Sequence, residues 1–307
     1  MNKYCLLTND VETTSIWFNS LRDKTGLKVL QEGMPILLDL YEKYNIKSTF
    51  FYTGYIAKLH PELVKMILPY GHEVGSHGLS HEKKHGFDVM DYDDQVYHLK
   101  ESKKILEDIS GEEVISFRSP ALRMSNSTVR ALVESEFKID SSVASQRFDM
   151  FMSFGGVQKV RWLTAPRLPY RASENNIFKK GDSSIIEIPL TAFGFPYVGT
   201  TMRVFPLLTN IQKHFFHWET SLNKKPIVFD IHPNEFIDES NEPRIIEKRG
   251  GDFLSSFFQD TLRSRLKVRN LGMKANPLYV SQIEFFKNKD YNFVTIKDYV
   301  KQQGFEI

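Results

Sequence analysis

Short apolar runs alternate along this chain with longer stretches in which apolar residues recur at helical spacing. The helical pattern is clearest at residues 93–109, where Val96, Leu99, Ile105 and Leu106 fall on one face. The predicted strands are 3–8, 48–53, 73–76, 114–117, 138–141, 184–190 and 226–231, and the predicted helices are 31–44, 61–68, 93–109, 127–135, 207–222 and 296–302. Strand–helix repetition of this kind predicts an α/β fold with a parallel sheet, and seven strand candidates favour a sheet closed into a barrel.

Two regions depart from this alternation. Residues 147–182 contain Pro166 and Pro169 and show no sustained period, so we expect a long insertion over the rim of the barrel. Residues 235–273 mix acidic and basic side chains and end in the basic run 263–269, which predicts a solvated face. We therefore expect a single domain over residues 1–307, with an insertion around 147–182 and a C-terminal extension around 235–307.

Composition narrows the classes of partner. The 307 residues are 41% hydrophobic, which is enough for a sizeable core. The chain has 40 Lys and Arg against 38 Asp and Glu, and a formal charge of only +2 does not indicate binding to nucleic acid. No stretch approaches the roughly 18 apolar residues of a membrane span, and residues 1–10 lack a signal-peptide core, so we expect a soluble, cytoplasmic protein. The lone cysteine, Cys5, sits in an apolar run and is predicted to be a buried structural thiol.

Polar residues follow several of the predicted strands. In barrels of this kind catalytic residues lie at the C-terminal ends of strands, so such residues are candidates for chemistry. The candidates are Asp10 and Glu12 after the first strand, His77 after the third, Arg118 after the fourth, Asp140 in the fifth and His232 after the last. We expect all of them to face one rim.

Two histidines could contribute to a metal site. Two neutral imidazoles and one carboxylate can hold a divalent metal and leave positions open for water and substrate. His77 and His81 are four residues apart, so one helical turn would put them on the same face, but His81 and His85 have the same spacing. Position favours the first pair because His77 follows a strand, whereas His85 follows a charged run and is predicted to be exposed.

Taken together, these motifs resemble the NodB-type polysaccharide deacetylases of carbohydrate esterase family 4. The matching stretches are Lys47-Ser-Thr-Phe-Phe51 (second strand), Gly71 to Ser76 with His77-Gly-Leu-Ser-His81 (the His-Ser/Thr-x-x-His motif, with glycine at the hydroxyl position), Phe117-Arg118-Ser-Pro120 (Arg-x-Pro), Lys138-Ile-Asp140-Ser-Ser142 (fourth motif), Ile186-Glu-Ile-Pro189 (penultimate strand) and Asp230-Ile-His232 (final motif). They occur in family order from Leu6 to about Pro233. The resemblance implies a distorted, seven-stranded (β/α) barrel of the polysaccharide deacetylase type.

The first motif departs from the usual Thr-Phe-Asp-Asp-Gly, since it reads Thr8-Asn9-Asp10-Val11-Glu12 and resembles an Asp-Val-Glu branch of the family. The resemblance implies Asp10 as general base and Glu12, His77 and His81 as metal ligands. It also implies that Arg118 pairs with Asp10 and lowers its pKa, and that Asp140 holds His232 as an imidazolium that protonates the leaving nitrogen.

The implied function is hydrolysis of an N-acetyl group from an amino sugar in a surface glycan, a nucleotide sugar or a lipid-linked precursor, with attack by a water on the metal. Zn²⁺ is favoured by the ligands, while Co²⁺, Ni²⁺ and Mn²⁺ accept similar donors. Two alternatives stay open: a deformylase or small-amide hydrolase, and a catalytically silent carbohydrate-binding homologue. The sequence names neither the sugar, the acyl group, the substrate-binding residues nor the oligomeric state.

Overall fold

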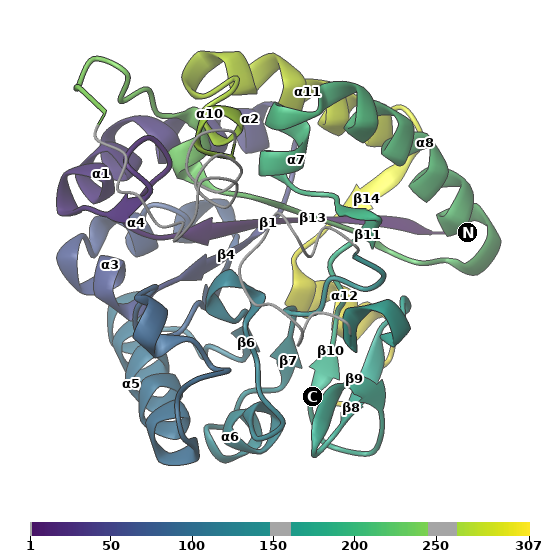
Figure 1. Ribbon diagram of the computed structural model, residues 1–307. Helices are drawn as coiled ribbons and strands as arrows, with labels where there is room; N and C mark the ends of the chain where they lie inside the picture. Colours follow the sequence, from purple (N-terminus) through teal and green to yellow (C-terminus); the bar gives the residue numbers. More distant parts are fainter. Residues whose placement is uncertain (1, 148–160, 245–262) are drawn as a thin grey trace, which may run out of the picture.

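Seven parallel strands form one curled sheet in the computed structural model, which describes residues 2–147, 161–244 and 263–307 (Figure 1). In order across the sheet they are β13 (Ile227–Ile231), β1 (Lys3–Val11), β4 (Thr49–Tyr52), β5 (Glu73–Ser76), β6 (Ser116–Phe117), β7 (Ile139–Asp140) and β10 (Ile186–Glu187). Each lies within one of the strands predicted from the sequence or, for β1, extends it. The predicted α/β barrel is therefore confirmed.

The barrel is distorted where the first and last of the seven parallel strands, β13 and β10, approach each other. β10 and β13 do not form a ladder; instead, Thr191, just after β10, donates its N–H to the Val228 carbonyl at 3.1 Å and accepts from the Val228 N–H through its hydroxyl at 2.9 Å. These two hydrogen bonds and an isolated bridge between Val198 and Asp230 connect β13 to residues that follow β10.

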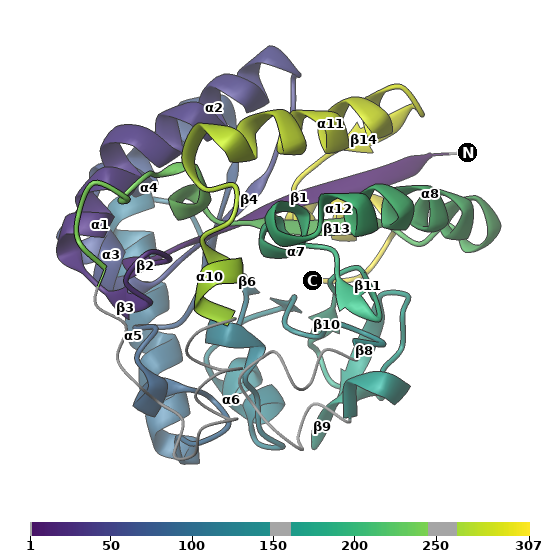
Figure 2. The ribbon, with the colours of Figure 1, turned by 45° about the horizontal axis from the view of Figure 1, so that its top comes forward.

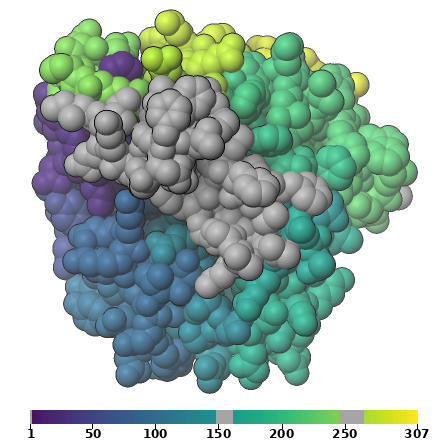
Figure 3. Space-filling view, in the orientation of Figure 1, coloured from purple at the N-terminus to yellow at the C-terminus, as the bar shows by residue number. Residues whose placement is uncertain are grey.

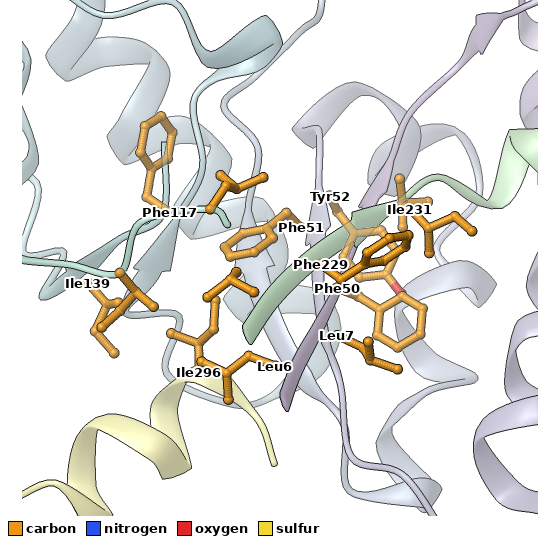
Figure 4. Close-up of a cluster of buried hydrophobic side chains, with 14 of the residues drawn as sticks. Leu6, Leu7, Phe50, Phe51, Tyr52, Phe117, Ile139, Phe229, Ile231 and Ile296 are labelled. Atoms are coloured by element: carbon orange, nitrogen blue, oxygen red, sulfur yellow. The ribbon is translucent and has the colours of Figure 1, made fainter. Parts of the chain in front are cut away.

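The strands are apolar on both faces because both faces are covered. Figure 4 shows Leu6 and Leu7 of β1, Phe50 to Tyr52 of β4 and Phe229 of β13 packed in one cluster, and all are at most 3% exposed. Such continuous apolar runs are typical of parallel sheets, which have helices on the outside.

Helices surround the sheet in both ribbon views (Figures 1 and 2). They are α1 (Asp23–Lys28), α2 (Met34–Lys43), α3 (Gly54–Leu59), α4 (Glu62–Lys65), α5 (Tyr92–Ser110), α6 (Thr128–Glu134), α7 (Gly199–Val204), α8 (Pro206–Asn223), α10 (Arg263–Lys267), α11 (Ala275–Lys287) and α12 (Ile296–Gln302), with a π-helical turn at Val29–Gly33 before α2. Among the described residues, no helix is long and apolar enough to cross a membrane.

The expected insertion at 147–182 contains regular structure that the sequence did not predict. β8 (Tyr170–Ser173) and β9 (Asn176–Lys180) form an antiparallel hairpin, and β8 also pairs with β10, so the hairpin extends the sheet. Residues 148–160 of this segment lie outside the described residues. The absence of a clear period reflects the short strands and the bulge between Ala172 and Ser173.

The C-terminal region also contributes to the barrel. β14 (Tyr291–Phe293) pairs in parallel with the first residues of β1, opposite Lys3 to Cys5, and α12 follows it directly. The basic run is only partly the solvated face that we expected, because Arg265 and Arg269 are exposed whereas Lys267 is half-buried with its ammonium 3.0 Å from the Asn19 amide oxygen.

Candidate active site

Strand β1 and its neighbour β13 bring three of the candidate residues to one rim. β1 runs to Val11, so Asp10 lies within the strand, not after it, and Thr8, Asp10 and Glu12 alternate onto the same side. Thr8 is in register with Asp230 of the neighbouring β13, so His232, two residues further on, reaches the same rim as Glu12.

The segment after β13 makes hydrogen bonds to the residues that follow β1. The Asn234 amide donates to the Thr14 carbonyl at 2.6 Å, and the buried Glu239 carboxylate accepts from the hydroxyls of Ser15 and Thr25. On the face shown in Figure 3, the light-green residues after β13 lie beside purple residues of the N-terminal part. The rim near Asp10 and Glu12 is thus held by contacts between the segments that follow β1 and β13.

Arg118 lies fully buried at the centre of the charged cluster. Its Nη1 donates to Asp10 Oδ1 at 3.0 Å and to Asp230 Oδ1 at 2.9 Å, while its Nε donates to the Ser141 carbonyl at 2.8 Å. Burial opposes the ionisation of Asp10, but the charges of His77, Arg118 and His232 outweigh it and lower the pKa of Asp10 to about 2. Asp10 is therefore a carboxylate at neutral pH, fixed in orientation by the guanidinium.

His77 is held in one tautomer. Its Nδ1 lies 2.8 Å from the Arg118 backbone oxygen, which can only accept, so Nδ1 carries the hydrogen and Nε2 carries the lone pair. Burial and the neighbouring His81 lower the pKa of His77 to about 4, so the ring is neutral. Nε2 is buried without a hydrogen-bond partner among the described residues, 3.7 Å from Asp10 Oδ2. A neutral imidazole fixed at one nitrogen with a free lone pair at the other is the arrangement of a metal ligand.

Glu12 and His81 are the other two residues of the expected ligand set. Glu12 Oε2 lies 3.3 Å from His81 Nδ1 and accepts a hydrogen bond from the Thr14 hydroxyl at 2.8 Å. The rings of His77 and His81 are 5.5 Å apart. The expected helical turn between them is wrong, because the chain is irregular there and Gly78 has a left-handed φ of 69°.

The donor types fit a divalent metal. Glu12, His77 and His81 supply a carboxylate and two imidazoles, although their three donor atoms do not all lie within 4.8 Å of one another; in the described part of the chain the group that meets this criterion is Asp10, Asp230 and His232. Arg118 already places a positive charge beside both aspartates of that group, which disfavours a cation there.

His232 has different partners from the one expected. Its Nδ1 lies 3.7 Å from Asp230 Oδ2 and 3.4 Å from Glu235 Oε1, and its Nε2 lies 3.8 Å from Glu12 Oε1. Burial lowers the pKa of His232, but Asp230 and the hydrogen bond with Glu235 outweigh this effect and raise the pKa to about 10. His232 is therefore an imidazolium at neutral pH.

Asp140 does not hold His232, which corrects the role that the sequence suggested. Its carboxylate accepts from the Ser142 hydroxyl at 2.6 Å and from the Ser142 N–H at 3.3 Å. Burial and the charge of Asp140 raise the pKa of the adjacent Glu187 carboxyl well above its usual value. Asp140 lies on β7, which pairs with β10, and the charged groups that raise the pKa of His232 are Asp230, Glu235, Asp10 and Glu12, not Asp140.

Asp230 belongs to the charged cluster, but it was not among the site residues predicted from the sequence. A signal was available, since Asp230 interrupts the apolar strand Ile227–Ile231 two positions before His232, and residues two apart on a strand share a face. His85 stays outside the cluster, as expected, but it is half-buried instead of exposed: its Nδ1 is 3.0 Å from the Ser80 hydroxyl and its ring is 4.6 Å from that of His98.

The described residues thus combine an α/β barrel with a rim of carboxylates, imidazoles and one guanidinium. Residues 15–139 match the family model described as polysaccharide deacetylase. This stretch contains His77, His81 and Arg118, while Asp10 and Glu12 precede it and Asp140 and His232 follow it. Residues 15–139 are thus similar to the polysaccharide deacetylase family, in agreement with the NodB-type motifs of the sequence. The assignment of its first motif to an Asp-Val-Glu branch stays a prediction.

Relatives of the chain agree with this family. A peptidoglycan deacetylase from Helicobacter pylori is 30% identical over 146 residues, which cover 45% of this chain and 49% of that protein. A peptidoglycan-N-acetylglucosamine deacetylase from Bacillus cereus is 43% identical over 47 residues, 15% of this chain and 22% of that protein. The chain thus spans about half or less of the length of these relatives.

Solved structures agree with the fold. A structure named as a polysaccharide deacetylase from Mycobacterium smegmatis has a TM-score of 0.61 at 17% identity, covering 100% of this chain and 93% of that one. An allantoinase has a TM-score of 0.56 at 17% identity, with 95% and 88% covered. At such identities the likeness concerns the barrel, and the chemistry rests on the residues of this chain.

Proposed function

We propose that the chain is a metal-dependent hydrolase that removes an N-acetyl group from an amino sugar of a polysaccharide, of peptidoglycan or of a precursor of either. The observation that carries this proposal is the state of His77: a neutral ring with Nδ1–H bound to the Arg118 carbonyl and Nε2 unpartnered, beside an ionised Asp10. The match to the family model and the peptidoglycan deacetylases among the relatives support the choice of an N-acetylated sugar.

Glu12, His77 and His81 would hold the metal, with Zn²⁺ favoured by two imidazoles and one carboxylate and Co²⁺, Ni²⁺ or Mn²⁺ as further candidates. When bound, the ion would polarise the amide carbonyl and make a water more acidic.

The residues of the chain would move the protons. Asp10 is ionised and can accept a proton from the attacking water, with Arg118 fixing the direction of its carboxylate. His232 is protonated and can donate a proton to the leaving nitrogen, because Asp230 and Glu235 stabilise the imidazolium through Nδ1 and leave Nε2 on the side of Glu12. Base and acid thus belong to neighbouring strands, β1 and β13.

Two substitutions separate the role of the base from that of the ligands. Asp10→Asn should retain the metal and lower kcat by about 10²- to 10⁴-fold, because it removes proton transfer and little else. Glu12→Gln should lose bound metal together with activity. Both are tested on purified protein by metal content and by release of acetate from N-acetylglucosamine oligomers, with His85→Ala as a histidine control outside the cluster.

A protein that binds no divalent metal, and whose His77→Ala variant releases acetate at the original rate, would overturn the proposal. Turnover of a formylated or small non-sugar amide without turnover of any N-acetyl sugar would support the assignment as a hydrolase and would reject the proposed substrate class.

A further inference from the structure

Helix α8 turns four of its large apolar residues outward, although it buries Phe216. Leu207, Ile211, Trp218 and Leu222 are 80%, 69%, 58% and 66% exposed, which is unusual for four large apolar side chains on one helix. Their spacing of four, seven and four residues puts them in one stripe along the helix. Figures 1 and 2 show α8 at the periphery of the molecule, with its outer side away from the sheet.

The charged residues of the same helix point the other way. α8 contains two, Lys213 and Glu219, and both are buried. The Lys213 ammonium lies 3.3 Å from the Ser281 hydroxyl, and Glu219 accepts two hydrogen bonds of 2.6 Å from Arg167. The exposed positions of α8 therefore include no Asp, Glu, Lys or Arg.

The stripe is large enough for a protein interface. Together with Phe193, which is 51% exposed and whose ring centroid lies 4.8 Å from that of Phe215 of α8, it presents on the order of 500 Å² of apolar surface, near the upper end for patches on monomers. A standard interface buries about 800 Å² per partner, so this patch could form most of one.

The spacing of the stripe has the symmetry of an antiparallel helix pair. Leu207 and Leu222 are equidistant from a point between His214 and Phe215, and so are Ile211 and Trp218. If two copies of α8 lie antiparallel about a two-fold axis at that point, Leu207 meets the partner's Leu222 and Ile211 meets the partner's Trp218. Such an isologous contact requires a surface that complements itself, and a face without charged side chains meets its copy without like-charge repulsion.

We propose that the chain forms a symmetric homodimer through the outer face of α8. A membrane surface is the competing occupant, but interfacial helices carry Lys and Arg at their polar edges, and the exposed positions of α8 carry none. The inference does not depend on the proposed function, because no residue of the stripe belongs to the charged cluster at the rim.

The dimer is tested by light scattering on the full chain during size-exclusion chromatography, over a dilution series. The original protein should elute with twice the chain mass of 35.7 kDa, and the double variant Ile211→Glu, Trp218→Glu should elute at the single mass with an unchanged circular dichroism spectrum. Tyr97→Glu is the control, since it places the same charge on a 59% exposed aromatic position of α5.

Cysteine crosslinking tests the antiparallel arrangement, and the buried Cys5 does not interfere. His214→Cys, next to the axis, should form an intermolecular disulfide on oxidation. Leu222→Cys should not, because its own copy would lie about 22 Å away along the helix.

The proposal would be overturned if the original protein eluted with the mass of one chain, or if the double variant still eluted with the mass of two chains. A monomer that binds phosphatidylcholine vesicles through α8, which would assign the stripe to a membrane, would also overturn it, and so would a crosslink at Leu222→Cys without one at His214→Cys.

Discussion

Gly78 sets the turn that brings His81 towards His77. Its φ of 69° is left-handed, and a Cβ at this position would lie 3.3 Å from Phe87 Cε2. A serine or threonine, which the family usually has here, would be strained in this backbone. The glycine in this motif is therefore explained by the local conformation of the chain.

Gly78→Ala should lower the free energy of unfolding by about 1–2 kcal/mol, because alanine is disfavoured in the left-handed region, and should also weaken metal binding. Gly111→Ala is the matched control, since its φ is 70° and a Cβ there has no neighbour within 4 Å. Urea unfolding and metal titration of both variants make the comparison. Equal metal affinity in the two variants would show that the turn does not position His81.

His72 should make the fold sensitive to acid. Its Nδ1 accepts from the Ser48 N–H at 3.1 Å, and burial, together with the charge of Lys47, lowers its pKa from 6.5 to about 4. The unfolded chain binds this proton more readily, so the stabilising contribution is complete above pH 6.5 and is lost as the pH falls towards 4.

Between pH 7 and pH 4.5 the original protein should therefore lose about 2.5 kcal/mol more stability than a His72→Asn variant, whose side-chain oxygen can accept the same hydrogen bond. Urea unfolding at the two pH values measures the difference. Parallel losses in both proteins would mean that other groups cause the acid sensitivity.

Individual site residues could be predicted to different degrees. Asp10, Glu12, His77 and Arg118 stand next to apolar runs, so strand ends indicated them, and the structure brings them together. The acidic partner of His232 could not be predicted from strand ends, because Asp140 and Asp230 both lie near the end of a strand. Only the order of the strands in the sheet decides which of the two carboxylates lies beside His232.

Among the elements, α12 supports the end of the barrel opposite the site. The first backbone N–H groups of a helix have no partner within it, and here the Ile296 N–H donates to the Thr49 hydroxyl at 2.9 Å and the Lys297 N–H to Glu73 Oε2 at 3.0 Å. The Asp298 N–H donates to the Thr295 hydroxyl at 3.0 Å. Strands β4 and β5 thus help to cap this helix.

Thr295→Ala should lower the free energy of unfolding by about 1 kcal/mol, because it removes the N-cap hydroxyl. Thr295→Ser keeps the hydroxyl and should unfold close to the original protein. The site lies at the other end of the strands, so KM should not change in either variant. Equal destabilisation by serine and alanine would show that the methyl group, not the cap, matters.

Element prediction was uneven, because α5 and α12 were predicted closely whereas the 13-residue α11 was not predicted. α12 has the predicted bounds, and α5 differs by one residue at each end, since Asp91 caps it and Gly111 ends it. The hairpin of β8 and β9, together with β14, escaped prediction because strands of three to five residues on the edge of a sheet carry little alternation.

For the whole molecule, the last part of the chain is part of the core. Ending the chain after Lys287 removes β14 and α12, which bury Tyr291, Phe293, Ile296, Tyr299 and Val300. At about 1.5–3 kcal/mol for each side chain, this loss is comparable with the entire stability of about 5–15 kcal/mol of a typical protein.

The shortened chain should therefore fail to fold, as judged by the loss of a cooperative thermal transition. A chain that ends after Phe305 is the control, because Glu306 and Ile307 are exposed, and it should stay within about 0.5 kcal/mol of the original. A cooperative transition in the chain that ends at Lys287 would contradict the assignment of these elements to the core.

The pairing of β1 with β13 has a consequence for how the protein reaches its native state. Residues 5–9 cannot find their partners until residues 227–231 have been synthesised, and residues 3–5 wait for 291–293. Pairings between such distant segments form slowly, because a long loop must close first. Asp10 and His232 belong to these strands, so recovery of activity during refolding should lag behind the formation of helices and report when the barrel has closed.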